Sequence, residues 1–454
     1  MHSQIDMTKG SIMKLVILFA LPICAGNILQ QLYNTVDTIV IGNFCDADAL
    51  AASLAAVGTS AQPVELLLCI FLGLGTGVSI LISQFTGNGD YDRLKRTVST
   101  STAFLYMCAI PLSILGWFIG PLVLKFMKVP ADAWNYSVTY VRIIFLGTLG
   151  NMGYNMNAGI LRGVGNSRSS LLFLVISCVV NIILDLLFVA VFDMGVAGVA
   201  LATAIAMFAS WFFSIFYIKK KYPELGFSVI PKHIDKKILA GIVKIGIPLG
   251  LNNSVYSIGH ILMQSLVNAQ GTVFMAACTA ATKVTGMANV AISSFSSAAT
   301  AFSGQNFGAG NYKRLQKGSL EIPLFSGLVT CVAGLIVTFF CRPILSCFKP
   351  TPEVLSLAAR YIIIVLPLTW PYAVFNGIIC FVNGIGEVRF PTVINILMLW
   401  AVRIPCAYLI ARYIDGTYIM ACFPVSFTFG MLAMLTYFRT KRWKEIKRLA
   451  AGQN

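Results

Sequence analysis

Charge is scarce in this chain. Its 454 residues include 33 basic and 17 acidic side chains, so charged residues make up 11% of the sequence, whereas soluble domains carry roughly 25%. Hydrophobic residues make up 57%, and the mean hydropathy is +0.80. This composition excludes an ordinary soluble enzyme and a disordered chain, and it predicts a protein whose surroundings are largely lipid.

Paired cysteines and histidines are also lacking. The twelve cysteines are scattered singly, no Cys-x-x-Cys pair occurs, and the chain has three histidines. A disulfide scaffold or a metal centre is therefore not expected, and we expect no cofactor. The motifs Gly-x-Ser-x-Gly, His-Glu-x-x-His and Gly-x4-Gly-Lys-Ser/Thr are absent as well, so we expect neither an intramembrane enzyme nor an ATP-driven pump.

The chain consists mainly of long apolar runs. A membrane-spanning helix needs roughly 20 apolar residues, and the first run is too long for a signal peptide, so we interpret it as a retained span. Charged residues and Gly, Pro and Asn separate the runs. The sequence thus predicts an all-α polytopic membrane protein with twelve transmembrane helices, at 12–41, 49–85, 94–119, 131–160, 168–191, 195–218, 238–268, 272–304, 314–341, 353–382, 390–412 and 416–438.

The basic residues fall mostly on one side of these spans. With twelve spans both termini share a side, and that side receives 24 Lys and Arg residues, whereas the other side receives six. Cytoplasmic loops of membrane proteins carry such an excess. We therefore expect both termini in the cytoplasm and the protein in a bacterial cytoplasmic membrane. The net charge of +16 then reflects topology, and nucleic acid is not needed as a partner.

The two halves of the chain contain a repeat. The segment Gln84-Phe-Thr-Gly-Asn-Gly-Asp-Tyr-Asp-Arg-Leu94 matches Gln305-Asn-Phe-Gly-Ala-Gly-Asn-Tyr-Lys-Arg-Leu315 at an offset of 221 residues, and Pro22 aligns with Pro248. Six spans per half give both repeats one orientation, as in transporters that alternate access between two lobes. We predict an N-terminal lobe at 1–222, a cytoplasmic linker at 223–237 and a C-terminal lobe at 238–454.

Two carboxylates interrupt the predicted spans of the first half. An ionisable side chain inside a bilayer is costly and suggests a function. Asp37 shares a helix face with Gln30, Tyr33 and Asn34, and Asp185 follows Asn181 at i, i+4 spacing. Such a pair with amide neighbours could hold a proton or an alkali cation, because burial and a second carboxylate both favour the protonated form of an acid. The alternative for Asp37 is a solvated position near the end of its span.

The second half lacks this acidic pair. Met263 aligns with Asp37, His260 with Asn34, and Cys406 with Asp185, so the coupling chemistry should be asymmetric. Gln30, His260, Lys283 and Arg403 could contact substrate or serve structural roles, and a structural role is favoured for Lys283 and Arg403. Arg403 could also extend toward the membrane surface. The role of Glu65 stays open.

At this point the chain resembles the multidrug and toxic compound extrusion (MATE) family. The resemblance covers nearly the whole length. It depends on Pro22…Gln31…Asp37…Gly42…Leu50-Ala-Ala52, the Gln84…Gly87…Gly89 loop, Leu161-Arg-Gly-x-Gly-Asn-x-Arg168, and the duplicated Gln305…Gly308…Gly310. The Asn181-x3-Asp185 pair is similar to that of the DinF-like bacterial branch.

The resemblance implies a secondary antiporter that expels organic, often cationic, compounds in exchange for protons or sodium ions, through two lobes that form a V-shaped central cleft. It implies that Asp37, Asn181 and Asp185 form the first-lobe cation site, with Tyr33, Asn157 and Thr203 as neighbours. We find no acidic residue aligned with a second-lobe site in the seventh or tenth span, so a second cation site is in doubt.

Two further expectations concern partners and alternatives. The expected partners are small organic substrates and the lipid bilayer, and we expect a monomer. The alternative function is a flippase for a lipid-linked saccharide of the same superfamily. Flippases often have more spans and a strongly basic cavity, and the few basic residues within these spans argue against that alternative.

Overall fold

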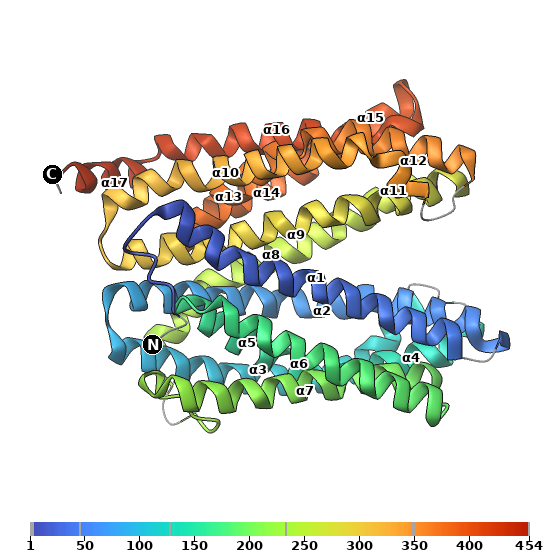
Figure 1. Cartoon of the computed structure of the whole chain (residues 1–454), viewed down its shortest axis with the longest axis horizontal. Helices are drawn as coiled ribbons and strands as arrows, with labels where there is room; N and C mark the ends of the chain where they lie inside the picture. Colours follow the sequence, from blue (N-terminus) through green and yellow to red (C-terminus); the bar gives the residue numbers. More distant parts are fainter. Residues whose placement is uncertain are drawn as a thin grey trace. The chain divides into compact units, whose positions relative to one another are not determined.

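The computed structural model describes residues 4–44, 47–126, 129, 131–231, 234–346 and 351–452. Over these residues the regular structure is helical throughout, and no strand occurs among them (Figure 1). The prediction of an all-α fold is confirmed. The contacts group the chain into two compact units: Met1–Ile5 with Ala25–Gly250, and Asp6–Cys24 with Leu251–Asn454.

Unit 1 is a helical bundle in which α2 contacts α3, α4 and α5, and α7 contacts α4, α5 and α6. The core between these helices contains Val78, Ile160, Phe173 and Trp211, all at most 6% exposed. Its helices are α1 (Ile12–Phe44, of which the second part belongs here), α2 (Ala47–Asn88), α3 (Tyr91–Phe126), α4 (Ala131–Leu146), α5 (Thr148–Gly163), α6 (Ser167–Asp185), the π-helix η1 (Leu186–Val191), α7 (Gly195–Lys221) and the short η2 (Pro223–Leu225).

Unit 2 repeats this arrangement, with α9 against α10, α12 and α13, and α16 against α13. Its elements are α8 (Lys236–Asn268, of which the second part belongs here), α9 (Thr272–Gly308), α10 (Tyr312–Phe339), α11 (Cys341–Ser346), α12 (Pro352–Val365), η3 (Leu366–Leu368), α13 (Trp370–Gly384), α14 (Arg389–Leu397), the π-helix η4 (Met398–Arg403), α15 (Ile404–Tyr413), η5 (Gly416–Ala421), α16 (Cys422–Leu435), η6 (Thr436–Arg439) and α17 (Lys441–Ala451).

Each of the twelve predicted spans coincides with a helix or a series of helical segments. Within the described ranges, nine helices are long and apolar enough to cross a membrane, and the pair Pro352–Leu368 and Trp370–Gly384, bent by 48°, makes a tenth. The other two predicted spans are α4 with α5, which separate at Gly147, and α9. Both are rich in small or polar residues, which lowers their hydropathy without preventing close helix packing.

The repeat seen in the sequence has the same backbone geometry in both units. Gly89 and Gly310 take the left-handed conformation at φ +68° and +70°, and Gly165 and Gly386 do so at +92° and +89°. Such angles suit glycine because it has no Cβ. Next to the first pair, the Asp90 amide donates to the Phe85 carbonyl at 3.1 Å, and the Asn311 amide donates to the Asn306 carbonyl at 2.9 Å. The matched loops are thus equivalent turns.

Both α1 and α8 are divided between the two units. The first part of α1, up to Cys24, groups with unit 2 and the rest with unit 1, whereas the first part of α8, up to Gly250, groups with unit 1 and the rest with unit 2. Both division points lie just after the aligned prolines Pro22 and Pro248, which lie inside their helices. A proline within a helix removes a backbone hydrogen bond and favours a bend. Each helix therefore passes from one unit to the other just after a position at which bending is favoured.

Candidate functional site

The strongest candidate site in unit 1 is the pair of carboxyl groups on α1 and α6. Asp37 is 7% exposed and Asp185 is fully buried, and the two carboxyl groups lie within electrostatic range of each other. Asp185 is the last residue of α6, where the helix changes to the π-helix η1. Single π-helical turns are rare and often mark functional sites.

Oxygen atoms at this site lack hydrogen-bond partners among the residues that the structure describes. They are one carboxyl oxygen of Asp37, both of Asp185 and the side-chain oxygen of Asn181. Asn181 is 2% exposed, and its side-chain nitrogen donates to the Thr203 hydroxyl at 3.5 Å. Buried acceptors without donors are costly, whereas a proton or an alkali cation between them would satisfy several at once. All four of these unpartnered atoms are oxygens, the ligand type that hard cations prefer.

Two tyrosines complete the surroundings of the acidic pair. Tyr33 is 7% exposed, lies near Asp37 and hydrogen-bonds with the Gln30 side chain. Tyr140 on α4 lies within electrostatic range of both Asp37 and Asp185. Sequence reasoning missed Tyr140, because an aromatic residue in an apolar span has no distinguishing pattern. Tyr33 was predicted from its position one helical turn before Asp37.

The remaining predicted neighbours lie elsewhere or outside the described side chains. Asn157 on α5 is 2% exposed, and its side-chain nitrogen donates to the Ser214 hydroxyl at 2.8 Å. Ser214 lies eleven residues beyond Thr203 on α7, which is roughly 16 Å along a helix. Asn157 is therefore bonded well away from the Asn181–Thr203 contact. The side chains of Asn34 and Glu65 lie outside the described part of the structure.

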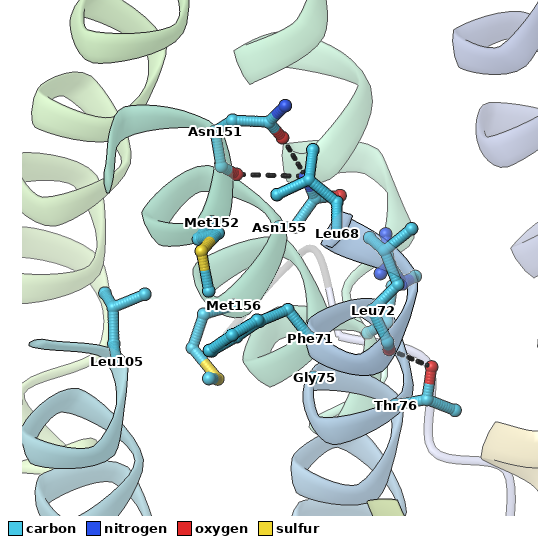
Figure 2. Close-up of a pocket in the computed structure, with 11 residues that line it drawn as sticks. Leu68, Phe71, Leu72, Gly75, Thr76, Leu105, Asn151, Met152, Asn155 and Met156 are labelled. Carbon is cyan, nitrogen blue, oxygen red and sulfur yellow. Dashed lines mark hydrogen bonds between the residues drawn. The ribbon is translucent and has the colours of Figure 1, made fainter. Parts of the chain in front are cut away.

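A second feature of unit 1 is a pocket of about 130 Å³ between α2, α3 and α5. Figure 2 shows Met152, Met156 and Phe71 along its apolar wall and Asn151 with Asn155 at one end. The Asn155 side-chain nitrogen donates to the Asn151 backbone oxygen at 2.9 Å and to its side-chain oxygen at 2.6 Å. Methionine adapts its shape readily, so this pocket suits apolar groups of varied outline.

In unit 2, Arg403 is a buried cation. It is 1% exposed at the end of the π-helix η4, and it donates to the hydroxyls of Ser426 and Tyr256 at 3.0 Å each. Its guanidinium carbon lies 4.8 Å from the ring centre of Phe423 and 5.1 Å from that of Phe427. These contacts join α8, η4 and α16, so Arg403 has the surroundings of a packing residue.

The other predicted residues of this group are more accessible. Gln30, His260 and Lys283 are exposed, and the His260 ring lies 4.8 Å from the Tyr256 ring in an edge-on arrangement. Lys283 forms no ion pair with a carboxylate within the described residues. Their roles in substrate contact therefore stay predictions.

Comparison with known proteins gives the family. The MatE family profile matches residues 22–187 and 248–409. The chain is 29% identical over 446 residues to the probable multidrug resistance protein YpnP of Bacillus subtilis (strain 168), covering 97% of this chain and 98% of that protein. It is 28% identical over 456 residues to the probable multidrug resistance protein YoeA of the same organism, covering 97% of each.

A solved structure of MATE in the bent conformation has the same fold, with a TM-score of 0.88 at 21% identity, covering 98% of this chain and 99% of that one. The two stretches of the family match begin at the aligned prolines Pro22 and Pro248 and end within the fifth predicted span of each repeat. The match therefore includes Asp37, Asn181 and Asp185 in the first stretch and Arg403 in the second. The chain belongs to the MatE family.

Proposed function

We propose that this protein is a multidrug efflux antiporter that exchanges protons or sodium ions for organic, often cationic, compounds by alternating access. The MatE family profile matches the chain, and its relatives include two probable multidrug resistance proteins of Bacillus subtilis. The single observation that carries the cation coupling is the set of buried oxygens without hydrogen-bond partners among the described residues, from Asp37, Asn181 and Asp185.

The proposed coupling follows from the charge of this pair. Two ionised carboxylates within electrostatic range repel each other strongly in a low-dielectric interior, so a proton or a sodium ion that binds between them is retained. Ion binding from outside would reposition α1 against α6 and favour release of the substrate to that side. When the site opens inward, the ion leaves and the substrate can bind again. Asp37, Asn181 and Asp185 hold the ion, and Thr203 orients the amide of Asn181.

The proposed membrane arrangement follows the sequence. The two lobes are 1–222 and 238–454, joined by the linker 223–237, and both termini are cytoplasmic in the bacterial plasma membrane. The protein acts as a monomer on small organic substrates. The pocket beside Met152 and Met156 is the proposed contact for apolar parts of these substrates, because its flexible side chains adapt to different outlines.

A transport assay in proteoliposomes tests the coupling. Proton and sodium gradients are imposed separately, and uptake or release of a fluorescent organic cation is measured for the parent protein and for Asp37→Asn and Asp185→Asn. We expect one gradient to drive transport in the parent and neither gradient to do so in the variants. Glu445→Gln, which neutralises an exposed carboxylate on α17, is the matched control and should transport normally.

The outcomes separate the steps of this proposal. Gradient-driven transport that persists in both single variants would refute the role of the acidic pair in ion coupling. Transport in the parent without dependence on either ion would overturn antiport, while leaving efflux itself in place. Movement of a lipid-linked saccharide in the same vesicles, with no movement of organic cations, would favour the flippase.

A further inference from the structure

In unit 2, α17 packs against α10 (Figure 1). A basic hollow of about 580 Å³ is lined by Lys313, Gln316, Lys317 and Leu320 of α10 and by Lys447, Ala450 and Ala451 of α17. The residues on α10 are spaced by three and four positions, so they share one face of that helix. Three lysines therefore line one open space.

The helix α17 is held so that its basic face stays exposed. Trp443, Ile446 and Ala450 are at most 2% exposed, and the Trp443 ring packs against the rings of Phe381 and Phe438 at 6.4 and 5.1 Å. Spacing of three and four residues puts these three on one side of the helix. Lys444 and Arg448 lie on the other side and are exposed, whereas the exposed Lys447 lies at the edge of the buried side, four residues after Trp443 and three before Ala450. The position of Lys447 is thus set by packing of a short amphipathic helix.

An aliphatic ridge continues from the hollow along α10. Leu320, Leu324 and Leu328 are 53%, 59% and 61% exposed and are spaced by four residues, on the face that also carries Lys313 and Lys317. Because α10 is long and apolar enough to be a membrane span, exposed leucines on this face lie against lipid. The hollow therefore stands at the end of a lipid-facing ridge, at the level where phospholipid headgroups lie.

The charges around the hollow favour an anion. Among the described residues, the Glu321 carboxylate lies 3.6 Å from the Lys317 ammonium. The residues that line the hollow include three lysines and no acid, so the lining is positively charged, and the Lys317 side chain is 69% exposed, so it can reach a ligand. Arg314 does not contribute, because it donates to the backbone carbonyls of Met7 and Gly10.

We propose that this hollow binds the headgroup of an anionic phospholipid, with one acyl chain along the leucine ridge. Lys313, Lys317 and Lys447 contact the headgroup phosphate, and Gln316 donates to its ester or glycerol oxygens. Leu320, Leu324 and Leu328 contact the acyl chain. A zwitterionic lipid would fit the ridge equally well but would leave the positive balance of the lysines unmatched. This site goes beyond the proposed transport function and does not depend on it.

Native mass spectrometry of the purified protein tests the proposal. The probes are phosphatidylglycerol and phosphatidylcholine with the same acyl chains, each titrated into detergent micelles. The variant Lys313→Gln/Lys317→Gln/Lys447→Gln is compared with Lys219→Gln/Lys220→Gln/Lys221→Gln, which removes the same charge from an exposed helix end in unit 1. We expect the parent and the control to prefer phosphatidylglycerol, and the test variant to bind it about tenfold more weakly.

The remaining outcomes decide against the proposal. Equal binding of the two lipids by the parent would overturn it, and so would an equal loss in the control variant, which would show a diffuse charge effect. Competition by millimolar inorganic phosphate that equals competition by phosphatidylglycerol would show a site for soluble anions instead. If the triple variant does not fold, Lys447→Gln alone is compared with Lys444→Gln, and only the former should weaken binding.

Discussion

A close crossing of α2 and α8 in unit 1 gives a quantitative prediction. A Cβ atom added at Gly73 on α2 would lie 2.2 Å from the Gly250 nitrogen, 2.5 Å from the Gly250 Cα and 2.7 Å from the Gly246 carbonyl oxygen on α8. Backbone atoms cannot rotate away, so Gly73→Ala requires α2 and α8 to separate by roughly 1 Å. Overpacking of this kind costs typically about 1–3 kcal/mol.

The matched control is Gly75→Ala, two residues along the same helix. A Cβ atom at Gly75 meets nothing within 4 Å. Both substitutions remove the backbone freedom of glycine, which stabilises a helix by about 1 kcal/mol. The stability difference between the two variants therefore isolates the clash. We expect Gly75→Ala to unfold at or above the temperature of the parent protein and Gly73→Ala to unfold below it.

Thermal unfolding in detergent, followed by tryptophan fluorescence and by the loss of the monodisperse peak on size exclusion, measures this difference. The α8 segment at this crossing ends where the chain passes from unit 1 to unit 2, so the transport rate of Gly73→Ala is a second readout. Equal unfolding temperatures for Gly73→Ala and Gly75→Ala would refute the close crossing of α2 and α8.

Three further predictions follow from buried or capping charges. Arg403→Lys should destabilise the protein by about 2–3 kcal/mol, because a lysine keeps the charge but loses the directed bonds and ring contacts of the guanidinium; thermal unfolding measures the loss. Arg314→Gln should loosen the segment 6–10, because Arg314 donates to the carbonyls of Met7, Lys9 and Gly10, and hydrogen exchange of that segment should rise. The backbone amides of Ile238 and Lys237, with help from Arg96, lower the pKa of Asp235. The ionised Asp235 carboxylate therefore stabilises the fold near neutral pH, and this stabilisation is lost as the pH falls below about 4. The parent and Asp235→Ala should consequently have the same unfolding temperature only in acid.

One control variant and two contradicting outcomes test these predictions. Arg412→Lys changes an exposed arginine near a helix end, whose guanidinium carbon lies 5.7 Å from the centre of the Tyr413 ring, and it should leave the unfolding temperature unchanged. Unaltered exchange of residues 6–10 in Arg314→Gln would contradict the role of its guanidinium. A constant difference between the parent and Asp235→Ala from pH 3 to pH 7 would show that the Asp235 carboxylate does not act through its charge.

The spans could be predicted from the sequence because each is a long apolar run. The interruptions within them could not. The separation of α4 from α5 at Gly147, the 48° bend before Trp370 and the π-helices η1 and η4 depend on which carbonyl each amide finds. Packing against neighbouring helices decides which carbonyl accepts from each amide. A hydropathy average over many residues contains no information about this pairing.

The candidate site was predictable only as far as charge reveals it. Asp37 and Asp185 stand out because carboxylates are rare within spans, and the structure places both in the interior, within electrostatic range of each other. Tyr140 was missed because its importance depends on packing of α4 against other helices. The bond from Asn157 to Ser214 likewise joins residues 57 positions apart, and no local pattern encodes it.

The loop motif of the repeat shows a different limit. Gln305 and Arg314 were recognised only as repeated residues. In the structure the Gln305 side-chain oxygen accepts from the Met7 amide at 3.0 Å, and Arg314 donates to the Met7 carbonyl at 3.1 Å. Met7 is fully buried by these contacts. Long-range polar bonds of this kind hold the segment before α1 on unit 2, and a sequence repeat gives no indication of them.

The two repeats differ most where their fifth spans carry a buried charge. In the first repeat Asp185 immediately precedes the π-helix η1, and in the second Arg403 ends the π-helix η4. A π-helical turn leaves backbone groups less regularly bonded, which lowers the cost of a local change in helix winding. The acid has unpartnered oxygens, whereas most of the guanidinium is bonded or stacked. A change of ionic state is therefore energetically open at Asp185 and strongly opposed at Arg403, whose guanidinium stays protonated in proteins. The proposed ion coupling is therefore assigned to the first repeat alone, whereas in the second repeat the contacts of Arg403 hold α8, η4 and α16 together.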